Sequence, residues 1–149
     1  MKAQKNILSV LSVILLFSIT ACKNKKAEQE KLQTEVMNVH DELMGKMESI
    51  MNNKSALSLI ENRLDSLKIV DASLDTAKLR LDIEKSKVTL TSSDDAMMKW
   101  MNDFNPDYSG KSEDQILDYL NKEKAKISVI KNKINQSLSN SDSLIIKYK

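Results

Sequence analysis

The residues best suited to chemistry in this sequence are its one histidine and a row of methionines. The row recurs at intervals of three and four residues, so a helix would place its members on one face. Imidazole and thioether groups are good ligands for soft ions such as Cu(I), so the row is a candidate copper site. We expect ordinary packing, in which methionine fills gaps between helices and the chain needs no cofactor. A binding protein for copper or for a small apolar ligand, using His40 and the methionine row, is the alternative. The candidate metal ligands are Met37, His40, Met44 and Met47.

A second group of candidates combines aromatic rings with methionine. Trp100 and Phe104 are one helical turn apart, Met101 follows Trp100, and Tyr108 comes shortly after. In a packed core these rings would close one end of a helical bundle. On the surface they would form an adaptable patch for a protein partner. These four residues are therefore the candidate partner-binding site.

The sequence carries no recognisable catalytic constellation. It contains no G-x-S-x-G elbow, no H-E-x-x-H motif and no glycine-rich phosphate loop. A nucleophile needs a base beside it, and the only histidine lies within the methionine row. We therefore expect that the protein is not an enzyme.

The first 22 residues have the pattern of an export signal. Lys2 and Lys5 precede an apolar run over residues 7–19 that is too short for a comfortable membrane span. The stretch Ile19-Thr20-Ala21-Cys22 resembles the lipobox of bacterial lipoproteins. This resemblance implies cleavage before Cys22 and attachment of acyl chains such as palmitate to that residue. It divides the chain into a signal peptide (1–21), a lipid-anchored tether (22–31) and a helical domain (32–149).

Cleavage would also change the charge balance. Removing Lys2 and Lys5 from 23 basic residues leaves 21, which equals the 21 acidic residues. A neutral chain has no basic excess for nucleic acid, so we expect none as a partner. The partners we expect are the membrane, through the lipid, and an envelope protein. Lys23 does not match the aspartate that retains enterobacterial lipoproteins in the inner membrane, so we expect an outer-membrane lipoprotein facing the periplasm.

Three weaker resemblances concern the cell envelope. Val39–Met44 together with residues 94–104 is similar to small helical lipoproteins of Bacteroidota, a group with no established activity. The triplets that begin at Asp65, Asp75 and Asp142 resemble the Bacteroidota O-glycosylation motif, which would place sugars on Ser66, Thr76 and Ser143. The ending Lys147-Tyr148-Lys149 resembles the murein lipoprotein, but the rest of the chain departs from that family. We therefore do not expect attachment to peptidoglycan.

The elements that must position these residues are helices. Two glycines and one proline are too few for the turns of a β-rich fold. We expect an all-α, antiparallel bundle, or coiled coil, of three long helices. The middle helix would be kinked or broken near residues 89–93, which would make four. We expect the chain to reverse direction at the loop 105–111, which holds Pro106 and Gly110.

The hydrophobic pattern predicts which faces are buried. The methionine row, widened by Val36, Leu43 and Ile50, would form the seam of the first helix, which would end at the polar run 52–55. In the second helix the predicted seam includes Leu57, Ile60, Leu64, Leu67, Leu74, Leu81 and Val88. A capping box at 112–115 would begin the last helix, with its seam at Ile116, Leu120, Ile127, Ile130 and Ile134 and a frayed end beyond residue 138.

Overall fold

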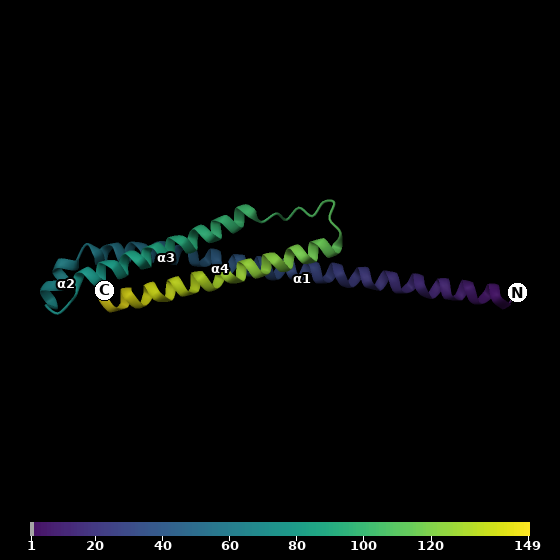
Figure 1. Cartoon of the computed structure of the whole chain (residues 1–149), viewed down its shortest axis with the longest axis horizontal. Coiled ribbons are helices and arrows are strands. Elements are labelled where there is room, and N and C mark those ends of the chain that lie inside the picture. The colour runs from purple at the N-terminus through teal and green to yellow at the C-terminus, as the bar shows by residue number, and fades with distance from the viewer. Residues whose placement is uncertain (1) are drawn as a thin grey trace. The chain divides into compact units, whose positions relative to one another are not determined.

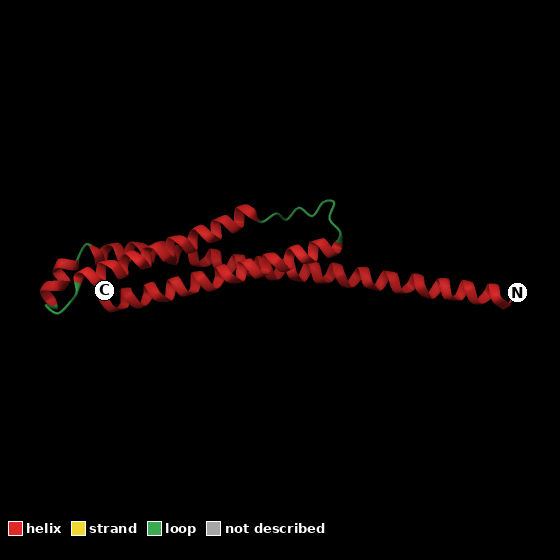
Figure 2. Ribbon diagram, viewed as in Figure 1, coloured by secondary structure: helices red, strands yellow, loops and turns green. Residues whose placement is uncertain are grey.

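The protein is all-α in the computed structural model, which describes the backbone of residues 2–149 and the side chains of residues 24–149. Its helices are α1 (Lys2–Glu61), α2 (Leu64–Val70), α3 (Thr76–Asp103) and α4 (Glu113–Tyr148), and the described backbone contains no strand (Figure 2). The predicted all-α class is confirmed. The predicted lipidation at Cys22 concerns a side chain outside the described residues.

The chain divides into two compact units. The first unit joins residues 1–37 to residues 105–124. Its core is Leu32 packed with Ile116 and Leu120, and Tyr108, Leu117 and Tyr119 cover that core. Ion pairs at its surface link Lys25 to Asp114 and Glu35 to Lys124, each at 2.7 Å.

The second unit comprises residues 38–104 and 125–149. It holds the end of α1, all of α2 and α3, and the end of α4. Within it, α4 runs parallel to α1, because Glu42 pairs with Lys131 and Asn53 bonds Asp142 eleven residues further along both helices. Helix α3 runs antiparallel to both. Figure 1 shows α3 returning from the short helix α2 alongside the end of α4. The observed up-down-up order is the predicted antiparallel topology.

The buried face of α3 differs from the prediction. The buried residues recur every three or four positions: Leu79, Ile83, Ser86, Leu90, Ser93, Met97 and Trp100. Leu81 and Val88, which we placed in the seam, are 64% and 61% exposed. The two rows have the same heptad spacing but lie on opposite faces of the helix. The observed core row is harder to recognise because two of its positions are serine.

The seam of α1 is also shifted from the prediction. Val36, Leu43, Ile50 and Leu57 are completely buried, whereas Met44 and Met51 are exposed. The methionine row therefore flanks the core instead of forming it. The expected break at residues 52–55 is wrong, since α1 continues to Glu61. Asn53 donates its amide to Ser141 Oγ and Asp142 Oδ1 at 2.8 and 2.7 Å, which satisfies this polar side chain without ending the helix.

The chain breaks after α1 at residues 62–63 and again at residues 71–75, on either side of α2, and the sequence pattern predicts neither break. Asp71 Oδ1 accepts hydrogen bonds from the backbone and hydroxyl of Ser73, at 2.9 and 2.6 Å, in an Asx turn. Asp75 then caps α3 by accepting from the Lys78 backbone N–H. The confirmed loop at 105–111 uses the same Asp-x-Ser turn, formed by Asp107 and Ser109. The Asp-x-Ser spacing was therefore a usable signal for both loops.

Residues 89–93 do not break α3, so of the predicted kink or break the break is wrong. The Thr89 hydroxyl donates to the Ser86 carbonyl and the Ser93 hydroxyl donates to the Thr89 carbonyl, at 2.9 and 2.8 Å. These bonds satisfy both hydroxyls within the helix, although such bonds favour the helix little by themselves. Leu90 is buried between them and anchors this turn in the core.

Helix α4 follows its predicted seam. Ile116, Leu120, Ile127 and Ile134 are buried and Ile130 is half-buried. The helix continues past the serine-rich run that begins at residue 139 and ends at Tyr148. Ser137 and Ser141 are buried in place of larger residues, and their hydroxyls donate to carbonyls one turn back. The core between α3 and α4 is therefore lined with small polar side chains.

The α1–α4 ion pairs predict acid sensitivity. Hydrogen bonds from Lys131 and Lys46 lower the pKa of Glu42 from 4.5 to about 2. As the pH falls, Glu42 is protonated in the unfolded chain before it is protonated in the folded one. The stability that the Glu42 ion pairs contribute is therefore fully present above pH 4.5 and is lost as the pH falls toward 2. We expect the thermal midpoint of Glu42→Gln to fall less steeply in this range than that of the wild type. Parallel pH profiles of the two proteins, measured by circular dichroism, would contradict this assignment.

Candidate functional site

Helices α1 and α3 contact each other along one seam, at two levels of the bundle axis. At one end the ring centroid of His40 lies 6.0 Å from that of Trp100. At the other end Glu61 pairs with Lys87 at 2.6 Å and contacts Arg80 at 4.0 Å. Residues of α1 between positions 40 and 61 therefore lie opposite residues of α3 between positions 80 and 100.

Two methionine groups that are far apart in the sequence lie on facing rows of this seam. Met47 lies one heptad after His40 and two heptads before Glu61, so it belongs to the row of α1 that contacts α3. Met101 lies two heptads after Lys87 and belongs to the facing row of α3. Both side chains are half-buried, as expected for residues at the border of a helical interface.

Three further methionines continue this surface outward. Met44 and Met51 are three and four residues from Met47, and Met98 is three residues before Met101, so each lies beside its neighbour on the helix surface. They are 41%, 66% and 49% exposed. We call Met44, Met47, Met51, Met98 and Met101 the methionine face. Met97 is fully buried one residue away, so the face has a defined inner edge.

The border of the methionine face is mainly acidic. Asp41 and Glu48 are exposed and lie one turn before and after Met44, and Asp95 is exposed one turn before Met98. The neighbouring Lys99 pairs with Asp103 at 2.7 Å, so its charge is largely balanced. Lys54, one turn after Met51, is a further cation at this border, so the rim holds more acidic than basic residues but is not uniformly negative.

His40 lies at one end of the face in a defined orientation. Its Nδ1 lies 2.8 Å from Asp41 Oδ1. A carboxylate only accepts hydrogen bonds, so Nδ1 carries the proton and Nε2 keeps its lone pair in the neutral ring. The side chain is 21% exposed. A histidine held by a carboxylate in this way has the geometry that metal-ligating histidines commonly show.

The four residues of the predicted partner patch do not form one exposed surface. Trp100 is buried, with 5% of its area exposed, and Phe104 stacks on it at 4.9 Å between ring centroids. The Trp100 environment thus matches the packing alternative, a ring plug within the bundle. Met101 alone of the four joins the methionine face. Tyr108 belongs to the other unit, where it meets Tyr119 edge-on at 6.2 Å and burial raises its pKa.

The predicted metal ligands are also divided. His40, Met44 and Met47 lie on α1 along the seam, while Met37 is half-buried in the first unit. The sequence pattern could not include Met98 and Met101, because only the pairing of α1 with α3 brings them near. Among the described side chains, no three His, Cys, Asp or Glu residues are grouped as metal ligands.

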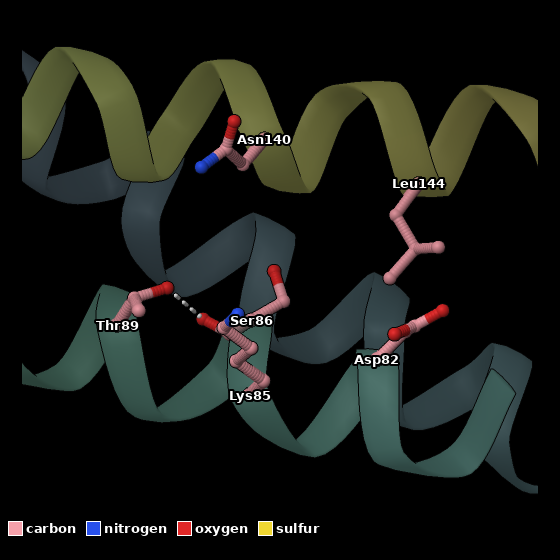
Figure 3. A pocket seen from close by; sticks show the side chains of 6 residues that line it. All are labelled: Asp82, Lys85, Ser86, Thr89, Asn140 and Leu144. Atoms are coloured by element: carbon pink, nitrogen blue, oxygen red, sulfur yellow. Dashed lines mark hydrogen bonds between the residues drawn. The ribbon is translucent and has the colours of Figure 1, made fainter. Parts of the chain in front are cut away.

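A separate polar cleft lies between α3 and α4 (Figure 3). It encloses about 250 Å³ and is lined by Asp82, Lys85, Ser86, Thr89, Asn140 and Leu144. It exists because Ser86 occupies a core position where a larger side chain would fill the space. The Ser86 hydroxyl is buried without a hydrogen-bond partner among the described residues. The cleft offers hydrogen-bonding groups and charges of both signs, but its lining includes no imidazole.

The predicted glycosylation sites differ in accessibility. Ser66 is exposed on α2, whereas Thr76 is half-buried at the start of α3. Ser143 is exposed, but its hydroxyl donates to the Ser139 carbonyl at 2.8 Å. Ser66 is thus the most accessible hydroxyl of the three.

Comparisons with known proteins add no family to these observations. The chain matches no protein-family model, no curated protein and no solved structure. Within the part of the chain that was described, no helix is both long and apolar enough to cross a bilayer. The function is therefore inferred from the geometry and charge of the chain's own residues.

Proposed function

We propose that the protein is a lipid-anchored protein of the cell envelope whose methionine face binds a basic, amphipathic helix of a protein partner. The anchor is inferred from the lipobox-like stretch that ends at Cys22. Two or more acyl chains hold a protein on a bilayer stably, so binding would occur at a membrane surface. An outer-membrane location facing the periplasm is part of this proposal.

The observation that carries the binding role is the exposure of Met44, Met51 and Met98 on the two helices that face each other at this seam. Soluble proteins rarely expose several large apolar side chains side by side without a use for them. Methionine suits helix binding because its unbranched, polarisable side chain adapts to different apolar shapes. A helix in a groove between two other helices is a recurrent mode of peptide recognition.

The charge around the face selects the kind of helix. Asp41, Glu48 and Asp95 would repel an acidic partner and attract lysine or arginine residues at the edges of the docked helix. Complementary charge increases the association rate and fixes orientation, while the thioethers supply apolar contact. A basic amphipathic helix therefore fits better than an acidic or uniformly apolar one.

A model peptide tests this role. A helix of about 18 residues, made of leucine and lysine on opposite faces, should bind the full-length chain in non-ionic detergent. We expect the paired substitution Met51→Lys with Met98→Lys to weaken binding about tenfold or more, because it removes apolar contact and adds positive charge. Fluorescence anisotropy of the labelled peptide measures the affinity, with empty micelles as the blank.

Matched variants separate docking from general charge attraction. Leu81→Lys with Val129→Lys adds the same two charges outside the face, at residues that are at least about as exposed as Met51 and Met98. This pair should bind the peptide within about twofold of the wild type. Equal weakening by both pairs, or equal binding of a peptide with glutamate in place of lysine, would refute docking at the methionine face.

A further inference from the structure

We propose that one end of the methionine face is a binding site for a soft monovalent cation, Cu(I) or its redox-inert analogue Ag(I). The ligands would be the His40 imidazole and the thioethers of Met44 and Met101. This site shares Met44 and Met101 with the docking surface but can be tested separately, because the ion needs the sulfur atoms whereas a docked helix also uses apolar contact that leucine retains. It also differs from the ligand set that the sequence suggested, since one ligand comes from α3.

The position of the three residues supports a shared ion. His40 and Met44 are one helical turn apart, so their side chains project from neighbouring points of α1. Met101 follows Trp100, whose ring lies 6.0 Å from the His40 ring across the seam. The register therefore places one thioether of α3 at the level of two donors of α1, and Cu(I) and Ag(I) accept few ligands of this soft kind.

The environment of His40 supports the same ion. Asp41 Oδ1 lies 2.8 Å from Nδ1 and accepts a hydrogen bond from it. The other ring nitrogen, Nε2, is therefore the one that would bind the ion. Thioethers are neutral, so the three ligands would leave the bound ion with its full positive charge. The exposed carboxylates of Asp41 and Glu48 lie close enough along α1 to attract that charge.

Trp100 provides a direct readout, because it is the only tryptophan of the chain and lies beside His40. The full-length chain with Cys22→Ser removes the only thiol, which would otherwise bind the same ions. Titration with Ag(I), and with Cu(I) under anaerobic conditions, should quench the Trp100 fluorescence and saturate at one ion per chain.

Leucine variants test the ligands without removing apolar volume, since methionine and leucine are similar in size. Met44→Leu with Met101→Leu should weaken Ag(I) binding about tenfold or more, and His40→Gln should do the same. Met51→Leu removes a sulfur from the same face, away from the site, and should bind as the parent does. Circular dichroism checks that each variant remains folded.

The outcomes distinguish this site from the helix-binding surface. Loss of Ag(I) binding in Met44→Leu with Met101→Leu, while the basic peptide still binds, supports the cation site. The absence of saturable quenching in the parent chain would overturn it. So would binding that the Met44→Leu and Met101→Leu pair leaves unchanged, because the ion would then lie elsewhere.

Discussion

Replacing Leu90 with alanine is expected to lower the free energy of unfolding by about 2–5 kcal/mol, whereas the same replacement at Leu81 should change it by less than about 0.5 kcal/mol. Leu90 is completely buried and Leu81 is 64% exposed on the opposite face of α3. Truncating Leu90 removes apolar contacts and leaves a cavity. Alanine at an exposed helical position loses little burial and favours the helix.

Urea unfolding followed by circular dichroism measures both variants. The pair is well matched, because each is a leucine-to-alanine change on the same helix. A larger loss at Leu81 would mean that the sequence-based seam through Leu81 and Val88 is the buried one. Met98 would then leave the surface, and the methionine face would not exist as described.

The second large effect concerns membrane attachment. We expect the wild-type chain, expressed in a bacterial host, to incorporate labelled palmitate and to have a mature N-terminus at Cys22. Cys22→Ser removes the thiol that carries the diacylglyceryl group, so palmitate incorporation should fall to background. Because the attachment is covalent, the difference should be all or none rather than graded.

Metabolic labelling combined with intact mass measurement gives the result. Lys23→Ala serves as the control, since it changes the neighbouring residue and keeps the thiol. Labelling that persists in Cys22→Ser would refute lipidation at this residue. A mature wild-type chain that begins at any residue other than Cys22 would refute the lipobox interpretation.

The sequence predicted the helix class, the loop at 105–111 and the seam of α4 because each depends on local signals. Pro106 ends a helix, and Gly110 adopts a φ of 76°, a left-handed conformation that favours glycine. Ile116, Leu120, Ile127 and Ile134 are buried on one stripe of α4, whereas Ile146 near its end is 79% exposed. These features follow from neighbouring residues and need no knowledge of the packing partners.

The buried face of α3 could not be predicted in the same way. Leu74, Leu81 and Val88 repeat every seven residues, as do the buried Ile83, Leu90 and Met97. Ser86 and Ser93 weaken the true row, because serine at a core position resembles a surface residue. Which row is buried depends on the facing helices, and that information is not local.

The methionine face could not be predicted from the sequence for a related reason. The sequence shows a methionine row on residues 37–51 and a methionine cluster at 97–101, but not that they face each other. Their meeting depends on the antiparallel register of α1 and α3, which is set by contacts such as Glu61 with Lys87. The buried Trp100, by contrast, was anticipated by the packing alternative.

Methionine oxidation with and without the basic peptide tests the proposed binding surface most directly. Dilute hydrogen peroxide converts accessible methionine to sulfoxide, which peptide mapping by mass spectrometry locates at each residue. In the free protein Met51 and Met98 should oxidise much faster than Met97, which is fully buried. The bound peptide should slow oxidation of Met44, Met51 and Met98 several-fold. Unchanged oxidation of these three residues at saturating peptide would contradict docking at the methionine face.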